Sequence, residues 1–440
     1  MRTVFKNEKV LQNCKIFRML EEQSKGKHLS FHTPGHKQKG FDITELSYSD
    51  NLSCPRGCIA EAEKDIAEIL GAEKSFILTD GSTSGVLSTL YAAKKLGVTK
   101  IALCEGSHKS VFNGCAALGI TPLVYSQKIE QKMPFPHTMY ELNEQFAPLL
   151  DEADALFFTS PDYYGNIVDW AEIRKYCDEK GKLLIVDGAH GGHLHFEKDL
   201  HAGQYADMWV DGVHKSLPAL TQGAVVSART KKCVEALAKG VDIFRTTSPS
   251  YPIMASVEYA VKYPRNTKLE EEVKSFAQGN ARIYKNKDWT KLVALFGENA
   301  FTVEKRLQAE GIYPEFCDGN AITFYLSPAT EQAEFAELCE RLTALFVEFP
   351  IAEGLAEEKK RVHKCETLPL PEKAETEWVP LEEAEGRICA GICGLFPPCV
   401  PLFSVGERIE KEKIRLLQSA DNVFGVKNGE ILVLKIENEE

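Results

Sequence analysis

Short apolar runs alternate with amphipathic stretches along much of this 440-residue chain, and this alternation limits the fold more than any other feature. The strand-like runs are Ser75–Leu78, Ile101–Cys104, Pro122–Tyr125, Ala155–Thr159, Leu183–Val186, Met208–Val210 and Ala224–Ser227. The stretches with helical spacing are Gly85–Leu96, Lys109–Leu118, Met139–Leu150 and Asp169–Lys180. This order predicts an α/β fold, in which helices cover both faces of a mainly parallel sheet.

The remaining residues are expected to form an N-terminal arm and a smaller C-terminal domain. A chain of this length exceeds one ordinary core, so two domains of unequal size are expected. We place the arm at residues 1–50, the large domain at 51–265, and a helical linker with a small α+β domain at 266–440. Residues 255–300 are expected to be helical. The small domain is expected to contain a strand at Ile322–Leu326, a helix at Glu331–Phe346 and a last strand at Ile431–Ile436.

Unusual polar residues follow five of the strand-like runs. Ligands of an open α/β sheet bind beyond the carboxyl ends of the strands, so we expect these residues to lie along one edge. The five segments are residues 79–85, 105–108, 160–165, 187–190 and 213–215. The functional site is therefore expected at that edge of the sheet.

Asp187 and Lys215 suggest a cofactor. Each stands at the tip of a strand-like run. Pyridoxal phosphate needs such a pair, because a lysine holds its aldehyde and a carboxylate keeps its pyridine nitrogen protonated. Either residue alone is equally consistent with a solvated charge at a strand end.

The segment DGSTSG at residues 80–85 is a turn that opens a helix. Backbone N–H groups and hydroxyls in such a turn bind phosphate, although the same residue types also cap ordinary helices. His108 follows another run and would either stack on a pyridine ring or be an ordinary loop histidine.

Closely spaced histidines and cysteines raise the alternative of zinc. Three histidines lie within residues 190–195, but two glycines between them leave their spacing poorly fixed. Two CxxxC pairs, at residues 54–58 and 389–393, lack the tighter CxxC form. We expect free thiols and no metal site.

Composition limits the partners. A net charge of −12 argues against nucleic acid or an anionic membrane. No apolar stretch has the length of a signal peptide core or a membrane span. Thirteen cysteines without a secretion signal favour a reducing compartment, so a cytoplasmic enzyme acting on a small molecule is expected.

Taken together, these segments resemble the Orn/Lys/Arg decarboxylase family, fold-type-I pyridoxal-phosphate enzymes with an aminotransferase-like large domain. The matching segments run in family order at residues 31–40, 42–46, 76–85, 106–110, 160–165, 187–193, 211–224, 246–256 and 396–407. The resemblance implies decarboxylation of arginine, lysine or ornithine to a diamine or polyamine precursor, with arginine or lysine favoured. It also implies a homodimer or a dimer of dimers with sites at the subunit interface. The large N-terminal wing of the acid-inducible members is absent.

The resemblance further implies a role for each site residue. Lys215 would carry the cofactor, Asp187 would pair with its pyridine nitrogen, His108 would stack on its ring, and His190 would line the pocket near the reacting carbon. The phosphate would be bound by Ser82, Thr83, Ser84 and His214. Thr246 and Ser248 of one subunit would complete the site of the other.

Three positions depart from the family pattern. Gly212 replaces the usual hydroxyl residue, Cys399 replaces a glycine, and residues 51–58 carry cysteines where a second acidic residue is usual. Other fold-type-I activities therefore stay open, namely an aminotransferase, an aldolase or a C–S lyase, as does a non-catalytic regulator. No arginine can be assigned as the carboxylate clamp of a transaminase, and no acidic residue can be assigned to a basic substrate side chain.

Overall fold

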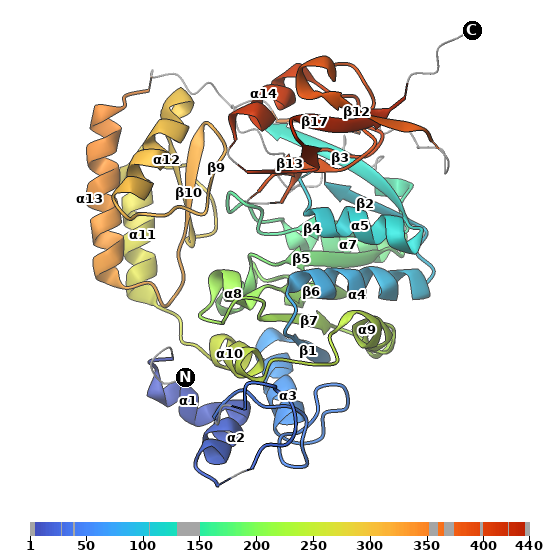
Figure 1. The fold of residues 1–440 in the computed structure, drawn as a ribbon, viewed down its shortest axis with the longest axis vertical. Coiled ribbons are helices and arrows are strands. Elements are labelled where there is room, and N and C mark those ends of the chain that lie inside the picture. Colours follow the sequence, from blue (N-terminus) through green and yellow to red (C-terminus); the bar gives the residue numbers. More distant parts are fainter. Residues whose placement is uncertain are drawn as a thin grey trace.

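The computed structural model describes residues 5–27, 29–37, 40–104, 106–129, 150–351, 360–364, 374–396, 399–420 and 422–435. An eight-stranded sheet forms its centre, in the order β1-β7-β6-β5-β4-β2-β3-β11 (Figure 1). The strands are β1 Lys74–Leu78, β2 Lys100–Cys104, β3 Thr121–Ile129, β4 Ala155–Thr159, β5 Leu183–Gly188, β6 Met208–Asp211, β7 Ala224–Ala228 and β11 Lys360–Lys364. All seven expected runs are strands. The helix expected over Met139–Leu150 lies outside the described residues except for its last position.

The prediction of a mainly parallel sheet is confirmed. Strands β3, β2, β4, β5 and β6 are parallel neighbours. Strand β7 instead runs antiparallel to both β1 and β6, and Asp211 pairs with Val225. The start of β7 therefore lies at the same edge as the end of β6.

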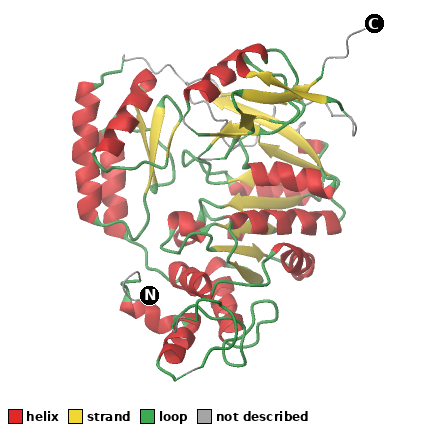
Figure 2. Ribbon diagram, viewed as in Figure 1, coloured by secondary structure: helices red, strands yellow, loops and turns green. Residues whose placement is uncertain are grey.

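Helices cover both faces of this sheet (Figure 2). One face carries α4 Ser82–Lys95, α5 Lys109–Leu118 and α9 Lys231–Phe244, and the other carries α3 Cys58–Leu70, α7 Trp170–Lys180 and α10 Tyr251–Val261. The central strands are apolar throughout because successive side chains enter opposite cores. In β4, Leu156 and Phe158 belong to the core with α7, whereas Phe157 belongs to the core with α4.

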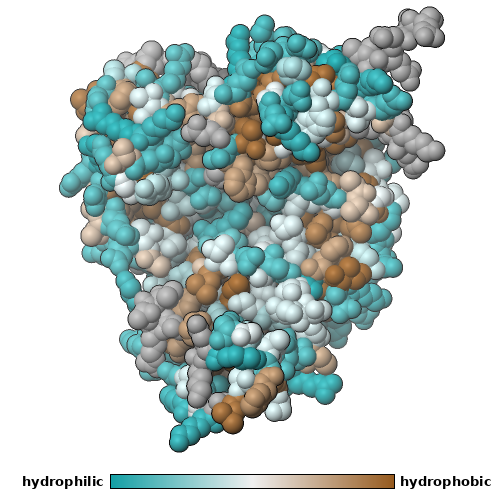
Figure 3. Space-filling model, viewed as in Figure 1, coloured by the Kyte–Doolittle hydropathy of each residue, from teal (hydrophilic) through white to brown (hydrophobic). Residues whose placement is uncertain are grey.

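The N-terminal arm contains α1 Glu8–Asn13 and α2 Lys15–Ser24. The buried Glu258 of α10 accepts hydrogen bonds from the backbone N–H groups of Lys15 and Ile16, at 2.7 and 2.9 Å, and so caps α2. After α2 the arm exposes large apolar side chains at Leu29, Phe31, Phe41 and Tyr48. Elsewhere, on the face shown in Figure 3, hydrophobic residues form small groups among hydrophilic ones.

Residues 267–349, called the small body here, pack three helices on a three-stranded sheet ordered β8-β10-β9. Its elements are α11 Thr267–Gly279, β8 Lys291–Leu295, α12 Ala300–Ala309, β9 Phe316–Cys317, β10 Ala321–Tyr325 and α13 Gln332–Glu348. The expected strand and helix in this region are confirmed. The helical expectation for residues 255–300 is wrong at β8, because the short run KLVAL fits a buried strand as well as a helix.

The C-terminal residues form two further three-stranded sheets, β12-β17-β16 and β14-β13-β15. Their elements are β12 Thr376–Pro380, β13 Cys393–Leu395, β14 Pro401–Phe403, α14 Lys411–Ser419, β15 Val423–Phe424, β16 Val426–Lys427 and β17 Glu430–Leu434. They lie beside β3, at the opposite end of the molecule from the N-terminal arm (Figure 1). Within the described ranges, no helix combines the length and hydropathy needed to cross a bilayer.

Candidate active site

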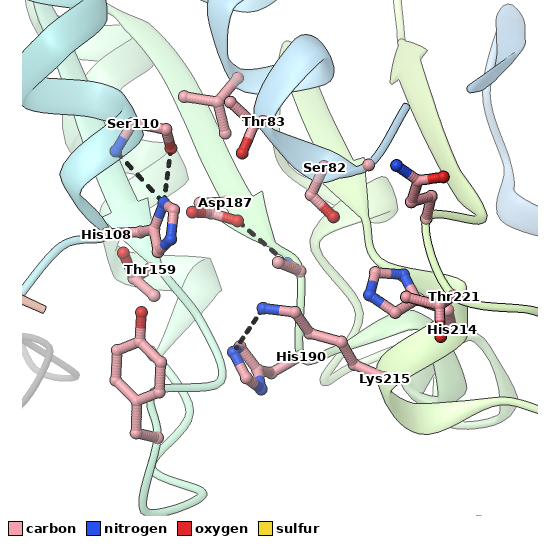
Figure 4. Close-up of a pocket in the computed structure, with 15 residues that line it drawn as sticks. Ser82, Thr83, His108, Ser110, Thr159, Asp187, His190, His214, Lys215 and Thr221 are labelled. Atoms are coloured by element: carbon pink, nitrogen blue, oxygen red, sulfur yellow. Dashed lines mark hydrogen bonds between the residues drawn. The ribbon is translucent and has the colours of Figure 1, made fainter. Parts of the chain in front are cut away.

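A cavity of about 220 Å³ lies at the carboxyl edge of the central sheet (Figure 4). Segments that follow β1, β2, β4, β5 and β6 all contribute side chains to it. The convergence expected from the five polar segments is therefore present. Of the expected residues, it is lined by Ser82, Thr83, His108, Asp187, His190, His214 and Lys215.

Lys215 lies in the single-turn helix α8 (Val213–Ser216), directly after β6. Its Nζ is 3.1 Å from Nε2 of His190. Burial lowers the pKa of Lys215, and the negative charge of Asp187 opposes this effect. An amine that is buried without an ion-pair partner becomes neutral more readily, and the neutral amine is the form that attacks an aldehyde.

Asp187 stands at the end of β5 with its side chain buried. Its Oδ1 accepts a hydrogen bond from the backbone N–H of Ala189 at 3.0 Å. Burial raises the pKa of Asp187, against the opposing charge of Lys215. A cationic N–H at this position would stabilise the ionised carboxylate, which a pyridinium nitrogen provides.

His190 is buried between two aromatic rings. Tyr163 and Tyr325 meet it edge-on, with ring centroids at 4.9 and 5.3 Å. Its Nδ1 is buried and has no hydrogen-bond partner among the described residues. Burial and the nearby charge of Lys215 hold its pKa well below the ordinary value, so the ring is neutral and one nitrogen is free for a ligand.

His108 caps the N-terminus of α5. Its Nδ1 accepts a hydrogen bond from the backbone N–H of Ser110 at 3.2 Å and lies 2.8 Å from the Ser110 hydroxyl. Burial, assisted by the charge of Lys215, lowers its pKa to about 3. The imidazole is therefore neutral at physiological pH and presents a flat face to the cavity.

The N-terminus of α4 opens onto the cavity at Ser82 and Thr83. Gly81 precedes the helix with a φ of 85° and supplies no side-chain cap, so the first N–H groups remain available. The Ser82 hydroxyl is buried without a partner among the described residues. Free N–H groups and a free hydroxyl at the start of a 14-residue helix suit a phosphate.

Ser84 is not among the residues that line this cavity, and its expected contact with the phosphate stays a prediction. Its hydroxyl lies 3.0 Å from a carboxylate oxygen of Asp80 and 2.9 Å from the carbonyl of Gly81. Helical rotation directs it inward, whereas Ser82 and Thr83 face the cavity. Ser84 is thus part of the local structure of the turn.

Close packing explains the glycine at position 212. A Cβ atom there would lie 2.3 Å from the carbonyl oxygen of Ala189 and 2.8 Å from the Ser82 hydroxyl oxygen. A larger residue could not fit without movement of the backbone at residue 189. The Ser82 hydroxyl occupies the space that a hydroxyl side chain at position 212 would need.

His214 lies at the cavity, whereas the TTSPSY segment at residues 246–251 does not line it. His214 lines it, with its Nδ1 2.9 Å from the carbonyl oxygen of Gly223. Thr246 and Ser248 are not among its lining residues, and Ser248 is exposed. The backbone N–H of Thr246 donates to Asp80 at 3.0 Å. Their expected contribution to a second subunit's site stays a prediction.

Residues from the small body were not anticipated near the site. Lys291 is buried beside His190, with its Nζ 4.3 Å from the ring centroid of Tyr325. The same Nζ lies 3.0 Å from the Thr290 hydroxyl and 3.5 Å from the carboxylate of Asp288. Neither Lys291 nor Tyr325 belongs to a recognisable motif, so only the docking of the small body reveals them.

His193, His195 and the cysteines of the CxxxC pair at residues 389–393 have local partners or remain free. His193 pairs with Asp288 at 2.9 Å, and His195 Nδ1 lies 2.7 Å from the carbonyl of Gly192. Within the described ranges, no group of three metal-ligating side chains converges on one point. Cys389 and Cys393 are buried neighbours with free thiols.

Comparison with known families accounts for this arrangement. The sequence family described as Orn/Lys/Arg decarboxylase, major domain, matches residues 40–294, which is more than half of the chain. The chain belongs to the Orn/Lys/Arg decarboxylase family. The C-terminal domain of the same family matches residues 362–424. The chain is therefore a decarboxylase that depends on pyridoxal phosphate.

Individual relatives extend this match over nearly the full length. The uncharacterized protein YaaO of Bacillus subtilis (strain 168) is 26% identical over 97% of this chain and 100% of its own. An arginine decarboxylase of the same strain is 28% identical over 91% of this chain and 92% of its own. The solved structure of the Escherichia coli constitutive lysine decarboxylase has a TM-score of 0.74 at 19% identity, covering 97% of this chain and 82% of that one. This structural likeness supports the fold alone.

The residues of this Orn/Lys/Arg decarboxylase fit its cofactor. A half-buried lysine, a buried carboxylate and a helix N-terminus with an unpartnered hydroxyl surround one cavity. These three features correspond to the aldehyde, the pyridine nitrogen and the phosphate of pyridoxal phosphate.

Proposed function

We propose that this enzyme decarboxylates arginine or lysine, releasing CO₂ and forming agmatine or cadaverine as a polyamine precursor. The observation that carries the proposal is the pairing of Lys215 with His190, 3.1 Å apart, in a cavity that also holds buried Asp187. Four relatives named arginine decarboxylase, 25–28% identical over 91–92% of this chain, support arginine. Ornithine is the third substrate to test.

The proposed site residues hold the cofactor at three points. Ser82, Thr83 and the first N–H groups of α4 bind its phosphate, with His214 beside them. Asp187 would accept a hydrogen bond from the ring nitrogen, and Lys215 would hold the aldehyde. When bound, pyridoxal phosphate supplies an electron sink that accepts the electron pair of the breaking Cα–carboxylate bond.

The protonation step belongs to Lys215 and His190. Loss of CO₂ leaves an electron pair at Cα, which must receive one proton before the amine is released. The two side chains lie within hydrogen-bonding distance of each other, and burial lowers the pKa of both. A proton shared by two side chains with lowered pKa values is readily transferred to carbon, and His108, which is neutral, does not compete for it.

We also propose a homodimer, or a dimer of dimers, in the cytoplasm. Four exposed apolar side chains of the arm, including Phe31 at 92% exposure, support an interface there. Thr246 and Ser248 would then reach the neighbouring subunit's site.

The cysteines of the described residues are free, in keeping with a reducing compartment. The domain limits at residues 50 and 265 remain part of this proposal.

Product identification tests the proposed function directly. Protein loaded with pyridoxal phosphate is incubated with arginine, lysine and ornithine separately, and the products are identified by mass spectrometry. Agmatine or cadaverine, absent with Lys215→Ala, is expected. A keto acid would indicate an aminotransferase instead. Failure to release CO₂ from any of the three amino acids would refute the proposal.

A further inference from the structure

The hydroxyl of Tyr163 opens onto the cavity and has no protein partner. Tyr163 follows β4, is only 3% exposed and lines the cavity together with Asp187 and Lys215. No hydrogen bond joins its hydroxyl to another group in the described part of the chain. Unlike the Ser82 hydroxyl, it is also not enclosed by protein atoms. A hydroxyl in a buried site usually has a hydrogen-bond partner, so a ligand in the cavity is expected to supply one.

Packing holds this hydroxyl in one place. The ring of Tyr163 meets the rings of His190 and Phe316 edge-on, with centroids at 4.9 and 6.5 Å. In the turn that carries Tyr163, the backbone N–H of Gly165 donates to the carbonyl of Asp162 at 3.1 Å. Burial raises the pKa of Tyr163 well above the ordinary value. The hydroxyl therefore stays protonated at neutral pH and can donate a hydrogen bond.

The order of the strands places Tyr163 opposite the start of α4. Across this part of the sheet the order is β1-β7-β6-β5-β4. Helix α4 follows β1, Lys215 follows β6, Asp187 lies at the end of β5 and Tyr163 follows β4. Figure 4 shows the same arrangement, with Ser82 of α4 and Thr159 of β4 on opposite sides of Asp187. The candidate phosphate site and Tyr163 therefore lie on opposite sides of the two residues that would hold the ring.

The phenolic oxygen of pyridoxal phosphate is expected on the side of the cavity where Tyr163 lies. On the pyridine ring, the aldehyde carbon stands between the phosphate arm and the phenolic oxygen. With the phosphate at α4, the aldehyde at Lys215 and the ring nitrogen at Asp187, this oxygen points away from α4 and towards the segment after β4. The oxygen is ionised when the ring nitrogen is protonated, and a negative oxygen in a buried site needs a hydrogen-bond donor.

Other donors on this side of the cavity are less suitable. The Thr159 hydroxyl donates to a neighbouring serine hydroxyl at 3.5 Å. One ring nitrogen of His190 lies 3.1 Å from Nζ of Lys215, and the other is enclosed by protein atoms. His108 is expected over the flat face of the cofactor and not beside its edge. The Tyr163 hydroxyl is therefore the donor best placed for the phenolic oxygen.

We propose that the Tyr163 hydroxyl donates a hydrogen bond to the phenolic oxygen of pyridoxal phosphate. This contact would hold the edge of the ring at a point that does not depend on Lys215, so the ring would keep its place when the amino acid substrate displaces the lysine. The inference rests on the contacts of Ser82, Asp187 and Lys215 given under the proposed function, because these contacts decide where the phenolic oxygen lies.

Two neighbouring tyrosines provide a matched pair of variants. Tyr163→Phe removes the open hydroxyl and keeps the ring that packs on His190, whereas Tyr164→Phe removes a hydroxyl that donates to Asp318 at 2.5 Å. Equilibrium dialysis would measure the binding of pyridoxal phosphate and of its deoxy analogue, in which hydrogen replaces the phenolic hydroxyl group. We expect Tyr163→Phe to weaken the binding of pyridoxal phosphate by about 10- to 100-fold, as for the loss of one hydrogen bond to a charged group. The affinity for the deoxy analogue should change by less than about threefold, and Tyr164→Phe should change both affinities by the same factor.

The pattern of the two affinities decides the role of Tyr163. An equal loss for both ligands in Tyr163→Phe would overturn the inference, because it would show a loss of packing and not of a contact with the phenolic oxygen. A loss below about threefold for pyridoxal phosphate would overturn it as well. The dialysis needs no substrate and is therefore independent of the product assay. A loss confined to pyridoxal phosphate, in a protein that releases no CO₂, would support the role of Tyr163 and refute the proposed function.

Discussion

Two lysines near His190, the half-buried Lys215 and the buried Lys291, belong to regions with opposite electrostatics. At the carboxyl edge of the large sheet, the polar contact of Lys215 is with the neutral His190. Within the described residues, no ion pair joins Lys215 to Asp187, although the charge of Asp187 opposes the lowering of the Lys215 pKa. In the small body, Lys291 has the carboxylate of Asp288, the Thr290 hydroxyl and the ring of Tyr325 around it. Asp288 also pairs with His193, so both bases on that side share one anion.

The difference shows that the reactivity of a lysine depends on whether it has an ion-pair partner and not on burial alone. Taking a cation out of water is costly unless it is paired, so an unpaired buried lysine tends to lose its proton and becomes a nucleophile. A paired buried lysine instead joins two pieces of structure. Lys291 fills the second role, because its Nζ also approaches the carbonyl of His190 at 3.5 Å.

The largest expected effect distinguishes the two lysines chemically. Lys215→Ala should lower decarboxylation by about 10⁴-fold or more, since it removes the covalent attachment of the cofactor. Borohydride reduction followed by peptide mass spectrometry should find the cofactor on Lys215 in wild type. It should find no label in the variant. A label transferred to Lys291 would contradict the comparison, because it would show that both amines are reactive.

Lys291→Met should have its main effect on stability. Removing one partner of a buried ion pair typically costs about 3–5 kcal/mol, because the remaining charge stays buried. Urea unfolding of the cofactor-free protein would measure the loss, with Lys287→Met as an exposed control expected to change stability by less than about 0.5 kcal/mol. Adding Asp288→Asn to Lys291→Met should recover part of the loss. A cost below about 1 kcal/mol for Lys291→Met would mean that the two regions do not differ as described.

The pH dependence of stability sharpens the comparison further. The pKa of His108 is about 3 when folded and near 6.5 when unfolded, so the unfolded chain binds more protons as the pH falls below 6.5. The contribution of neutral His108 to the free energy of unfolding is fully present above pH 6.5. It is lost on acidification, by about 2 kcal/mol at pH 5. His108→Asn keeps a helix cap without a titrating group. Between pH 7 and pH 5, cofactor-free wild type should therefore lose about 2 kcal/mol more than this variant in urea unfolding. Equal losses would argue against a neutral His108.

The smallest expected effect concerns the two serines at the start of α4. Ser82→Ala should weaken cofactor binding about tenfold, as expected for one charge-assisted hydrogen bond to phosphate. Ser84→Ala should leave the affinity nearly unchanged, because its hydroxyl is directed to Asp80 and Gly81. Equilibrium dialysis with pyridoxal phosphate would compare them. The reverse order would show that the phosphate lies along the other side of the helix start.

The sequence predicted the large domain better than the small body, for a physical reason. Each strand and the residue after it form one local pattern, so Asp187 and Lys215 could be identified together with their positions on the sheet edge. The segment DGSTSG does not reveal which hydroxyl faces the cavity, because that depends on helix rotation, and the Ser84 hydroxyl is directed to Asp80 and Gly81. Lys291 and Tyr325 reach His190 only through docking of the small body, which lies far along the chain from Lys215. No local pattern records such a contact.

The antiparallel direction of β7 has a consequence for how this enzyme could be altered. The segment that carries His214 and Lys215 leaves the sheet at Asp211 and returns at Val225, and these two residues are paired neighbours. Both ends of the segment are therefore anchored side by side at one edge. The segment is therefore exchangeable between relatives as one piece, because the distance between its two ends is fixed by the sheet. The exchange requires that position 212 remains glycine and that the carbonyl of residue 189 keeps its position next to it.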